Sequence, residues 1–207
     1  MMILDAWNCF GNRWKTCHEK NVLAALAICV AWTMVAGAQP HAIDTGKSTL
    51  TVRVYKAGVF SALGHDHEIA APISRGTVDA AARRVELDVK ASALQVRDRD
   101  ASGKDRDQIQ STMLGPEVLD AQQYPEITFR STEIQPAGPD VWNVQGNLAL
   151  HGETRAVTVQ VRQQNGHYVG SSRFKQSDFG IKPVKVAGGA VRVKDEIQIE
   201  FDIQLAP

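Results

Sequence analysis

Apolar and polar residues alternate along much of the chain after residue 48. In the segment 48–55, for example, Leu50, Val52 and Val54 fall on one side of an extended backbone and the residues between them on the other. The same alternation recurs in the segments 83–90, 126–130, 141–150, 154–161 and 191–205. A period of two residues predicts strands with one buried and one solvated face, which is the pattern of antiparallel sheets.

One segment in this region has a helical pattern instead. Ser102 and Asp105, three residues apart, form a capping pair typical of a helix N-terminus. Ile109 and Met113, four residues apart, share one face of a helix. We therefore expect a short helical insert near residues 103–119 that covers a mouth or an edge of the sheet.

These segments together predict an all-β fold of about eight antiparallel strands with one helical insert, arranged as a barrel or a sandwich. Polar turn residues at 135–140 and 163–166 separate neighbouring strands at hairpin distance. An eight-stranded barrel has room for packed side chains or for one small ligand. The alternation does not distinguish a packed interior from one that holds a ligand, because an inward apolar face fits either.

The N-terminal part of the chain has a different pattern. An apolar run at 21–38 follows basic residues and ends in Ala-Gly-Ala, which is the layout of a secretory signal with its cleavage site. The sequence thus predicts a signal peptide at 1–38 with cleavage near Ala38, a linker at 39–47 and a barrel domain at 48–207. An uncleaved N-terminal anchor is the alternative.

Composition narrows the classes of protein that remain. The chain has 23 basic and 23 acidic side chains, and this balance gives no basic surface for nucleic acid. Cys9, Cys17 and Cys29 all precede the predicted cleavage site. The mature chain would therefore have no disulfide, thiol nucleophile or thiolate metal site. Export would place it in a periplasm or outside the cell, as a protein that does not span the membrane.

The segment 63–72, which reads LGHDHEIAAP, concentrates residues of the metal-ligand type. His65 and His67 are two residues apart, so they share a face of a strand and could bind one metal ion together. A zinc site needs three or four protein donors. The remaining candidates are distant in the sequence: His41, His151 and Asp178. We therefore expect no metal or cofactor, and a metal- or haem-linked protein that uses His65 and His67 is the alternative.

Catalytic patterns are weak in this sequence. Asp66 with its neighbouring histidines could supply a general base, and Ser61 and Ser177 are candidate nucleophiles. No nucleophile-elbow pattern surrounds either serine, and no glycine-rich phosphate loop joins a strand to a helix. The sequence predicts a protein that is not an enzyme.

Three motifs in the strand region carry a resemblance to a known family. Tyr124–Ser131 reads YPEITFRS, Val144–Val159 reads VQGNLALHGETRAVTV and Ser177–Ile181 reads SDFGI. Their order and spacing resemble those of YceI-like proteins over nearly all of residues 48–205. The resemblance implies a lipocalin-like barrel with an apolar lumen, export to the periplasm and binding of isoprenoids or other long-chain amphiphiles. The chain departs from the family at Gln176, where many relatives have an arginine.

The resemblance and the alternation together predict an exported carrier protein that holds an isoprenoid or fatty small molecule in its lumen. The residues expected on the lumen wall are Val52, Val54, Phe60, Phe129, Trp142, Phe174 and Phe179. The residues expected at the rim, near a polar head group, are His65, His67, Asp178 and Lys175. A stress-related interaction module with an incidental cavity is a second alternative, and a homodimer stays open.

Overall fold

The computed structural model of the protein describes residues 39–57, 66–186 and 191–207. The chain divides into two compact units, residues 1–36 and 37–207, and every described residue belongs to the second unit. The predicted signal peptide lies outside the described residues. Among those that are described, no helix is long and apolar enough to cross a membrane.

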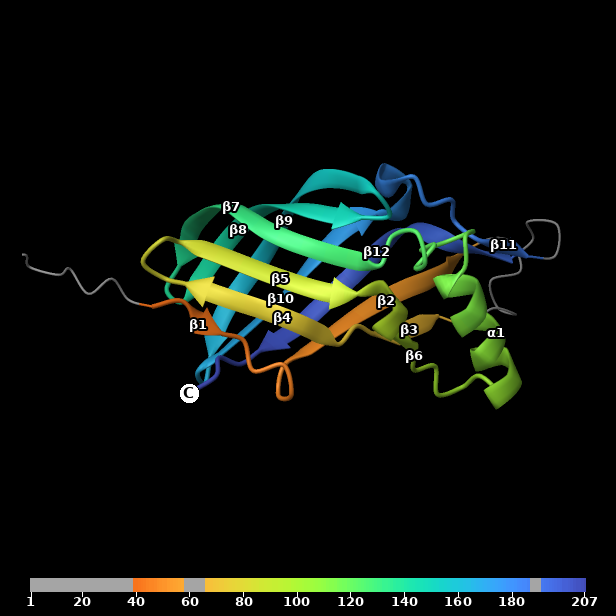
Figure 1. Ribbon diagram of the computed structural model, residues 1–207, viewed down its shortest axis with the longest axis horizontal. Coiled ribbons are helices and arrows are strands. Elements are labelled where there is room, and N and C mark those ends of the chain that lie inside the picture. Colours follow the sequence, from red (N-terminus) through yellow and green to blue (C-terminus); the bar gives the residue numbers. More distant parts are fainter. Residues whose placement is uncertain (1–38, 58–65, 187–190) are drawn as a thin grey trace, which may run out of the picture. The chain divides into compact units, whose positions relative to one another are not determined.

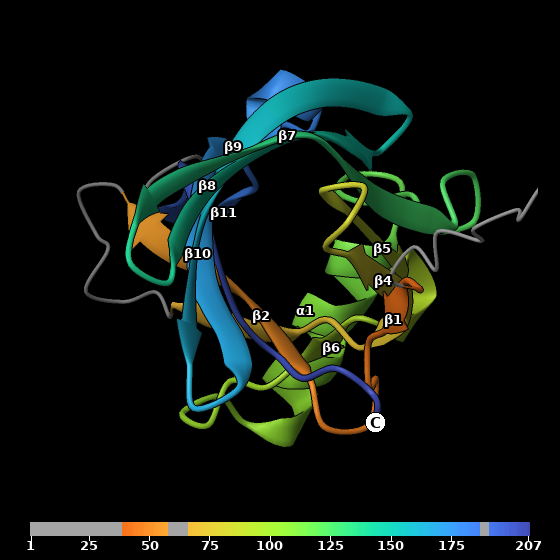
Figure 2. The same ribbon diagram turned by 90° about the vertical axis from the view of Figure 1, so that its left-hand side faces the viewer.

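The second unit is built around one antiparallel sheet of twelve strands that curls into a half-barrel (Figures 1 and 2). Its strand order is β1-β4-β5-β7-β8-β9-β10-β12-β2-β3-β6, and β11 pairs with β12 outside this path. The strands are β1 (His41–Ala42), β2 (Thr49–Ala57), β3 (His67–Ala70), β4 (Ile73–Asp79), β5 (Arg84–Lys90), β6 (Gln95–Val96), β7 (Glu126–Gly138), β8 (Val141–Leu150), β9 (Glu153–Gln164), β10 (His167–Lys175), β11 (Lys185–Val186) and β12 (Val191–Ile203).

The prediction of an all-β antiparallel fold is confirmed, and the prediction of eight strands is not. In the described part of the chain, eight strands have at least seven residues, namely β2, β4, β5, β7, β8, β9, β10 and β12. The other four have two to four residues. Strands that short contain only one or two periods of the alternation, which is too little for the hydrophobic pattern to reveal them.

The segment expected to be a linker, 39–47, contributes a strand to the sheet. β1 pairs with the end of β4, with His41 opposite Val78. The residues that follow β1 reach the end of the chain: Asp44 donates its backbone N–H to the Gln204 carbonyl at 2.8 Å. Because residues 41–44 bond to β4 on one side and to residues 204–206 on the other, they join β4 to the segment that follows β12 at this end.

Close approach of side chains to the backbone fixes the curvature of the sheet between β7 and β8. Gly146 of β8 lies opposite Ser131 of β7, next to a register shift at Ser131/Glu133. The Phe129 ring occupies the space over Gly146, where a Cβ would overlap the ring and lie 2.7 Å from the Arg130 carbonyl oxygen. A bulge and a glycine side by side let the strands bend around the interior.

The helical insert is confirmed: it consists of one helix and the turns that follow it. Helix α1 (Gly103–Leu114) begins after Ser102, whose hydroxyl accepts the Asp105 backbone N–H at 3.2 Å. Only Met113 of this helix is buried. Gln110 ties α1 to β6 by accepting the Val96 backbone N–H at 2.8 Å. The residues after Leu114 form turns, because Gly115 and Pro116 end the helix.

The main core lies at one end of the half-barrel, where α1 and two short 3₁₀ helices pack against the strands. These short helices are η2 (Ala91–Ala93) and η3 (Gln176–Phe179). The buried residues of this core are Ile69, Ala71, Val89, Leu94, Met113, Leu119, Leu150, Phe179 and Ile181. We call this region the closed end; the opposite end, with β1 and the C-terminus, is the turn end (Figure 1).

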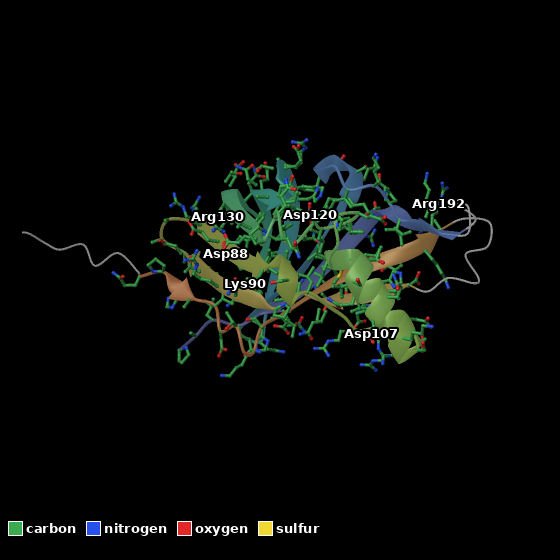
Figure 3. All side chains as sticks on the ribbon, turned by 45° about the vertical axis from the view of Figure 1, so that its right-hand side comes forward. Asp88, Lys90, Asp107, Asp120, Arg130 and Arg192 are labelled. Atoms are coloured by element: carbon green, nitrogen blue, oxygen red, sulfur yellow. The ribbon has the colours of Figure 1, made fainter. Side chains whose placement is uncertain are left out.

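The outer face of the sheet carries one buried charge, Asp88 of β5 (Figure 3). Arg75 of β4 donates to its Oδ2 from Nη2 at 2.6 Å and from Nε at 3.0 Å. The guanidinium of Arg130, from β7, contacts Oδ1 as an ion pair. Burial alone would raise the pKa of Asp88, but the two guanidinium groups outweigh it and hold the pKa below the ordinary value of 3.8. The charge therefore links three neighbouring strands.

Replacement of Gly146 by alanine is expected to lower the free energy of unfolding by about 1–3 kcal/mol, because the new methyl group overlaps the Phe129 ring. Gly103→Ala is the control, since nothing lies within 4 Å of its added Cβ. Urea unfolding followed by circular dichroism measures both variants. Equal stability of the two would contradict the packing argument.

Asp88→Asn is expected to lower the free energy of unfolding at neutral pH by about 1.5–3 kcal/mol, since it removes charged hydrogen bonds. A depressed folded-state pKa contributes stability above the unfolded-state value, and this contribution is lost as the pH falls through the folded-state value. The gap between wild type and variant should therefore close below about pH 4. Asp107→Asn, on the exposed side of α1 (Figure 3), should change little at any pH. A pH-independent gap for Asp88→Asn would refute the assignment.

Candidate ligand-binding lumen

The half-barrel encloses a cavity of about 470 Å³. This volume lies within the range of small-molecule sites, about 300–1,000 Å³. The strands of the sheet supply nearly all of its wall. Figure 2 looks into the half-barrel from the turn end, with α1 at the far end.

The wall of the cavity is almost entirely apolar. Each long strand contributes side chains from one face, as the alternation requires. Representative wall residues are Leu50 and Val52 of β2, Leu87 of β5, Ile127 and Phe129 of β7, Val144 and Leu148 of β8, Val157, Val159 and Val161 of β9, and Ile197, Ile199 and Phe201 of β12. The lining residues with charge or hydroxyl groups are Asp79, Arg83, Tyr168 and Ser172. Ser172 is satisfied, because its hydroxyl donates to the Thr158 carbonyl at 2.9 Å.

The interior of the half-barrel is open rather than packed. Inward-facing residues along the middle of the strands, such as Leu87, Phe129 and Val159, are only partly buried. In a packed interior the same positions would be closed to solvent, since protein cores leave few voids larger than a water molecule. The structure therefore decides the question that the alternation left open, in favour of a lumen.

The two ends of the lumen differ. Leu94, Leu119 and Leu150 form its floor at the closed end, and all three are buried. At the turn end the wall reaches the exposed turn between β4 and β5, where Ala80 and Arg83 line the lumen. The lumen is thus deep and apolar, with its mouth at the turn end.

The predicted wall residues fall into three groups. Val52, Phe129, Trp142 and Phe174 line the lumen. Val54 packs against the core at the closed end and does not line the lumen. Phe179 is fully buried behind the wall, with its ring centroid 5.3 Å from that of Phe174. Phe179 was predicted on the lumen wall, but η3 directs its side chain into the core instead. Phe60 lies outside the described residues.

The predicted rim residues do not gather at the mouth. Lys175 ends β10 and Asp178 belongs to η3, so both lie at the closed end, and both are exposed. Asp178 contributes its carbonyl, which accepts the Arg155 Nε–H at 2.9 Å. The sequence predicted these two charged residues at a rim, near a polar head group, but only the strand directions decide which end of the lumen they reach. His65 lies outside the described residues.

His67 is held by a buried carboxylate. Its Nδ1 lies 2.6 Å from Oδ2 of Asp98, whose side chain is 2% exposed. The other oxygen of Asp98 accepts the Glu68 backbone N–H at 2.8 Å. Asp66, on the other face of the strand, accepts the Lys56 backbone N–H at 2.9 Å. These contacts fix β3 to β2 and to the residues after β6, and they give His67 a structural partner.

The described residues include no group of three or more His, Cys, Asp or Glu side chains arranged to hold a metal ion. The distant candidates have other places: His41 is exposed in β1, and Nδ1 of His151 lies 3.1 Å from the Phe179 carbonyl oxygen. The Ser177 hydroxyl donates to Asp195 Oδ2 at 2.6 Å. Ser61 lies outside the described residues.

The motifs that carried the family resemblance meet at the closed end. Tyr124 stacks edge-on against His151, with ring centroids 4.8 Å apart. Gly152 follows with φ +79°, and a Cβ there would lie 2.6 Å from the Tyr124 ring. His151 contacts the Phe179 carbonyl, and Phe179 fills the core. These residues close the half-barrel and position its floor, so the motifs specify the fold more than the ligand.

Two residues at the mouth were missed by the sequence reasoning. Asp79 and Arg83 line the lumen from the turn between β4 and β5. The sequence marks this position only as a break between alternating segments, DAAARR at 79–84, and nothing in it says that the turn faces an opening.

The match to known proteins agrees with this geometry. The YceI-like domain family matches residues 41–205 of the chain. The chain belongs to the YceI-like family. Its match begins at β1, in accord with the role of residues 41–44 in the sheet. The residues that line the lumen all lie within the matched segment.

Several relatives are similar to this chain over most of their length. UPF0312 proteins of Vibrio cholerae and Vibrio parahaemolyticus are each 26% identical to this chain over 195 residues, which is 88% of this chain and 97% of each relative. The crystal structure of BcnA from Burkholderia cenocepacia is similar in fold, with a TM-score of 0.59 and 24% identity over 80% of this chain and 99% of that one.

Phe179→Ala is expected to lower the free energy of unfolding by about 3–5 kcal/mol, because it leaves a cavity in the core at the closed end. Trp142→Ala should cost less, since Trp142 faces the open lumen and is only partly buried. Urea unfolding of the two purified variants compares them. A larger loss for Trp142→Ala would contradict the division into core and lumen.

Proposed function

We propose that this YceI-like protein is a non-catalytic carrier that holds one long-chain amphiphile, an isoprenoid or a fatty compound, in the lumen of its half-barrel. One observation carries the proposal: the interior is apolar, open at one end and unfilled by side chains. An unfilled apolar interior is costly for the protein alone, because the wall loses the packing contacts that a filled core would have. A ligand with a long apolar tail restores those contacts.

Simple energetics favour a long tail. Burial of one methylene contributes about 0.8 kcal/mol, so a five-carbon isoprene unit contributes roughly 3–4 kcal/mol before losses. Association and ordering cost about 4–15 kcal/mol. Three to five buried units, as an order-of-magnitude estimate, would therefore bind well without a polar contact. The same arithmetic tolerates tails of varied chemistry.

We further propose that the protein works after export, in the periplasm. The support is in the sequence: basic residues, an apolar run and Ala-Gly-Ala before residue 39. N-terminal sequencing of the protein isolated from its native host would check this. A mature chain that begins at Met1 would contradict it.

Extraction of freshly purified protein with organic solvent, followed by mass spectrometry, tests the carrier function directly. The expected result is a stoichiometric prenyl or fatty compound, and a fluorescent prenyl analogue should bind the extracted protein at micromolar concentration. The proposal fails if no lipid is recovered and no analogue binds.

Val159→Trp is expected to weaken binding of a fluorescent prenyl analogue at least tenfold, because the indole would occupy the middle of the lumen. The free energy of unfolding should change by less than about 1.5 kcal/mol, since the added side chain enters open space. Thr158→Trp is the matched control: it adds the same side chain on the exposed outer face of β9. Equal binding by both variants would place the ligand elsewhere.

A further inference from the structure

The turn between β4 and β5 brings a charged side chain to the mouth of the lumen. Asp79, the last residue of β4, accepts the Ala82 backbone N–H at 2.7 Å and so stabilises the turn. Arg83 is the last residue of the turn, and its side chain lines the lumen. Arg84, the next residue, begins β5 and does not line it.

Arg83 occupies a backbone conformation that arginine does not favour. Its φ is +51°, in the left-handed region. For an L-residue with a side chain this conformation costs about 1–2 kcal/mol, and glycine or asparagine adopts it more readily. The stability of the turn therefore gives no reason for an arginine at this position. A side chain kept where the backbone disfavours it points to a use for that side chain.

The surroundings of Arg83 suit an anionic group. Among the described residues that line the lumen, Arg83 is the one with a cationic side chain, and it makes no ion pair with another described residue. The carboxylate of Asp79 is engaged by the turn. Arg83 is exposed at the mouth, where its guanidinium is accessible to an anion. Its fork of N–H groups matches carboxylates and phosphates.

We propose that Arg83 binds the anionic head group, a carboxylate or a phosphate, of the amphiphile whose tail fills the lumen. This inference rests on the proposed carrier function. The ligand enters tail first, because the floor at Leu94, Leu119 and Leu150 is apolar and closed. The head then stays at the mouth, within reach of the β4–β5 turn.

The test compares ligands that share a tail and differ in the head. Hexadecanoic acid is paired with hexadecanol, and farnesyl phosphate with farnesol, and hexadecylamine reports a preference for cations. Titration calorimetry uses protein that has first been extracted with organic solvent. It should show that at least one anion binds about tenfold more tightly than its alcohol, a difference in binding free energy of about 1.4 kcal/mol. The pair with the larger ratio of anion affinity to alcohol affinity shows whether the site prefers a carboxylate or a phosphate.

Arg83→Asn is expected to remove this preference while leaving alcohol binding and the fold intact, and its melting temperature should equal or exceed that of the wild type. Arg84→Asn removes the same charge one residue away and should keep the preference. Equal affinity of anions and alcohols for the wild type would overturn the head-group site alone. An equal loss of the anion preference in Arg83→Asn and Arg84→Asn would do the same, and so would tighter binding of hexadecylamine than of the anions. Failure of every ligand to bind would overturn the carrier function as well.

Discussion

The burial of Phe179 holds the closed end of the half-barrel together. Phe179 is 0% exposed, and its ring packs edge-on against that of Phe174. Its carbonyl oxygen lies 3.1 Å from Nδ1 of His151. η3 places the ring there by turning the chain directly after β10. Since the middle of the half-barrel is open, much of the packing that stabilises the sheet is concentrated at this end.

An open lumen and a stable sheet make opposite demands on the same side chains. A lumen keeps inward apolar residues apart, whereas stability favours their contact. The protein separates the two demands in space. Its main core gathers at the closed end, and a smaller buried cluster includes Ile43 and Ile203. Residues 41–44 join β4 to the segment after β12 at the turn end, and Asp88 ties three strands from outside. The middle is left unfilled by side chains, and the proposed ligand would add to the stability of the folded state by binding there.

The family motifs and the mouth of the lumen lie at opposite ends of the half-barrel. Tyr124, His151, Gly152 and Phe179 come from the segments that identify the family, and they build the closed end. The mouth is built by a turn whose residues carry no recognisable pattern. Recognition of the family therefore predicted the architecture well, while the residues best placed to choose a ligand escaped it. Arg83 became visible only when its φ and its place on the wall were known.

The sequence by itself determined the antiparallel strands, the helical insert and four of the wall residues, because a two-residue period and a capping pair act locally. It could not determine the short strands β1, β3, β6 and β11, because two to four residues are too few to display the alternation clearly. It also could not decide whether Phe179 faces a lumen or a core. Only the tertiary structure shows which ends of the strands meet, and so where the lumen is floored and where it opens.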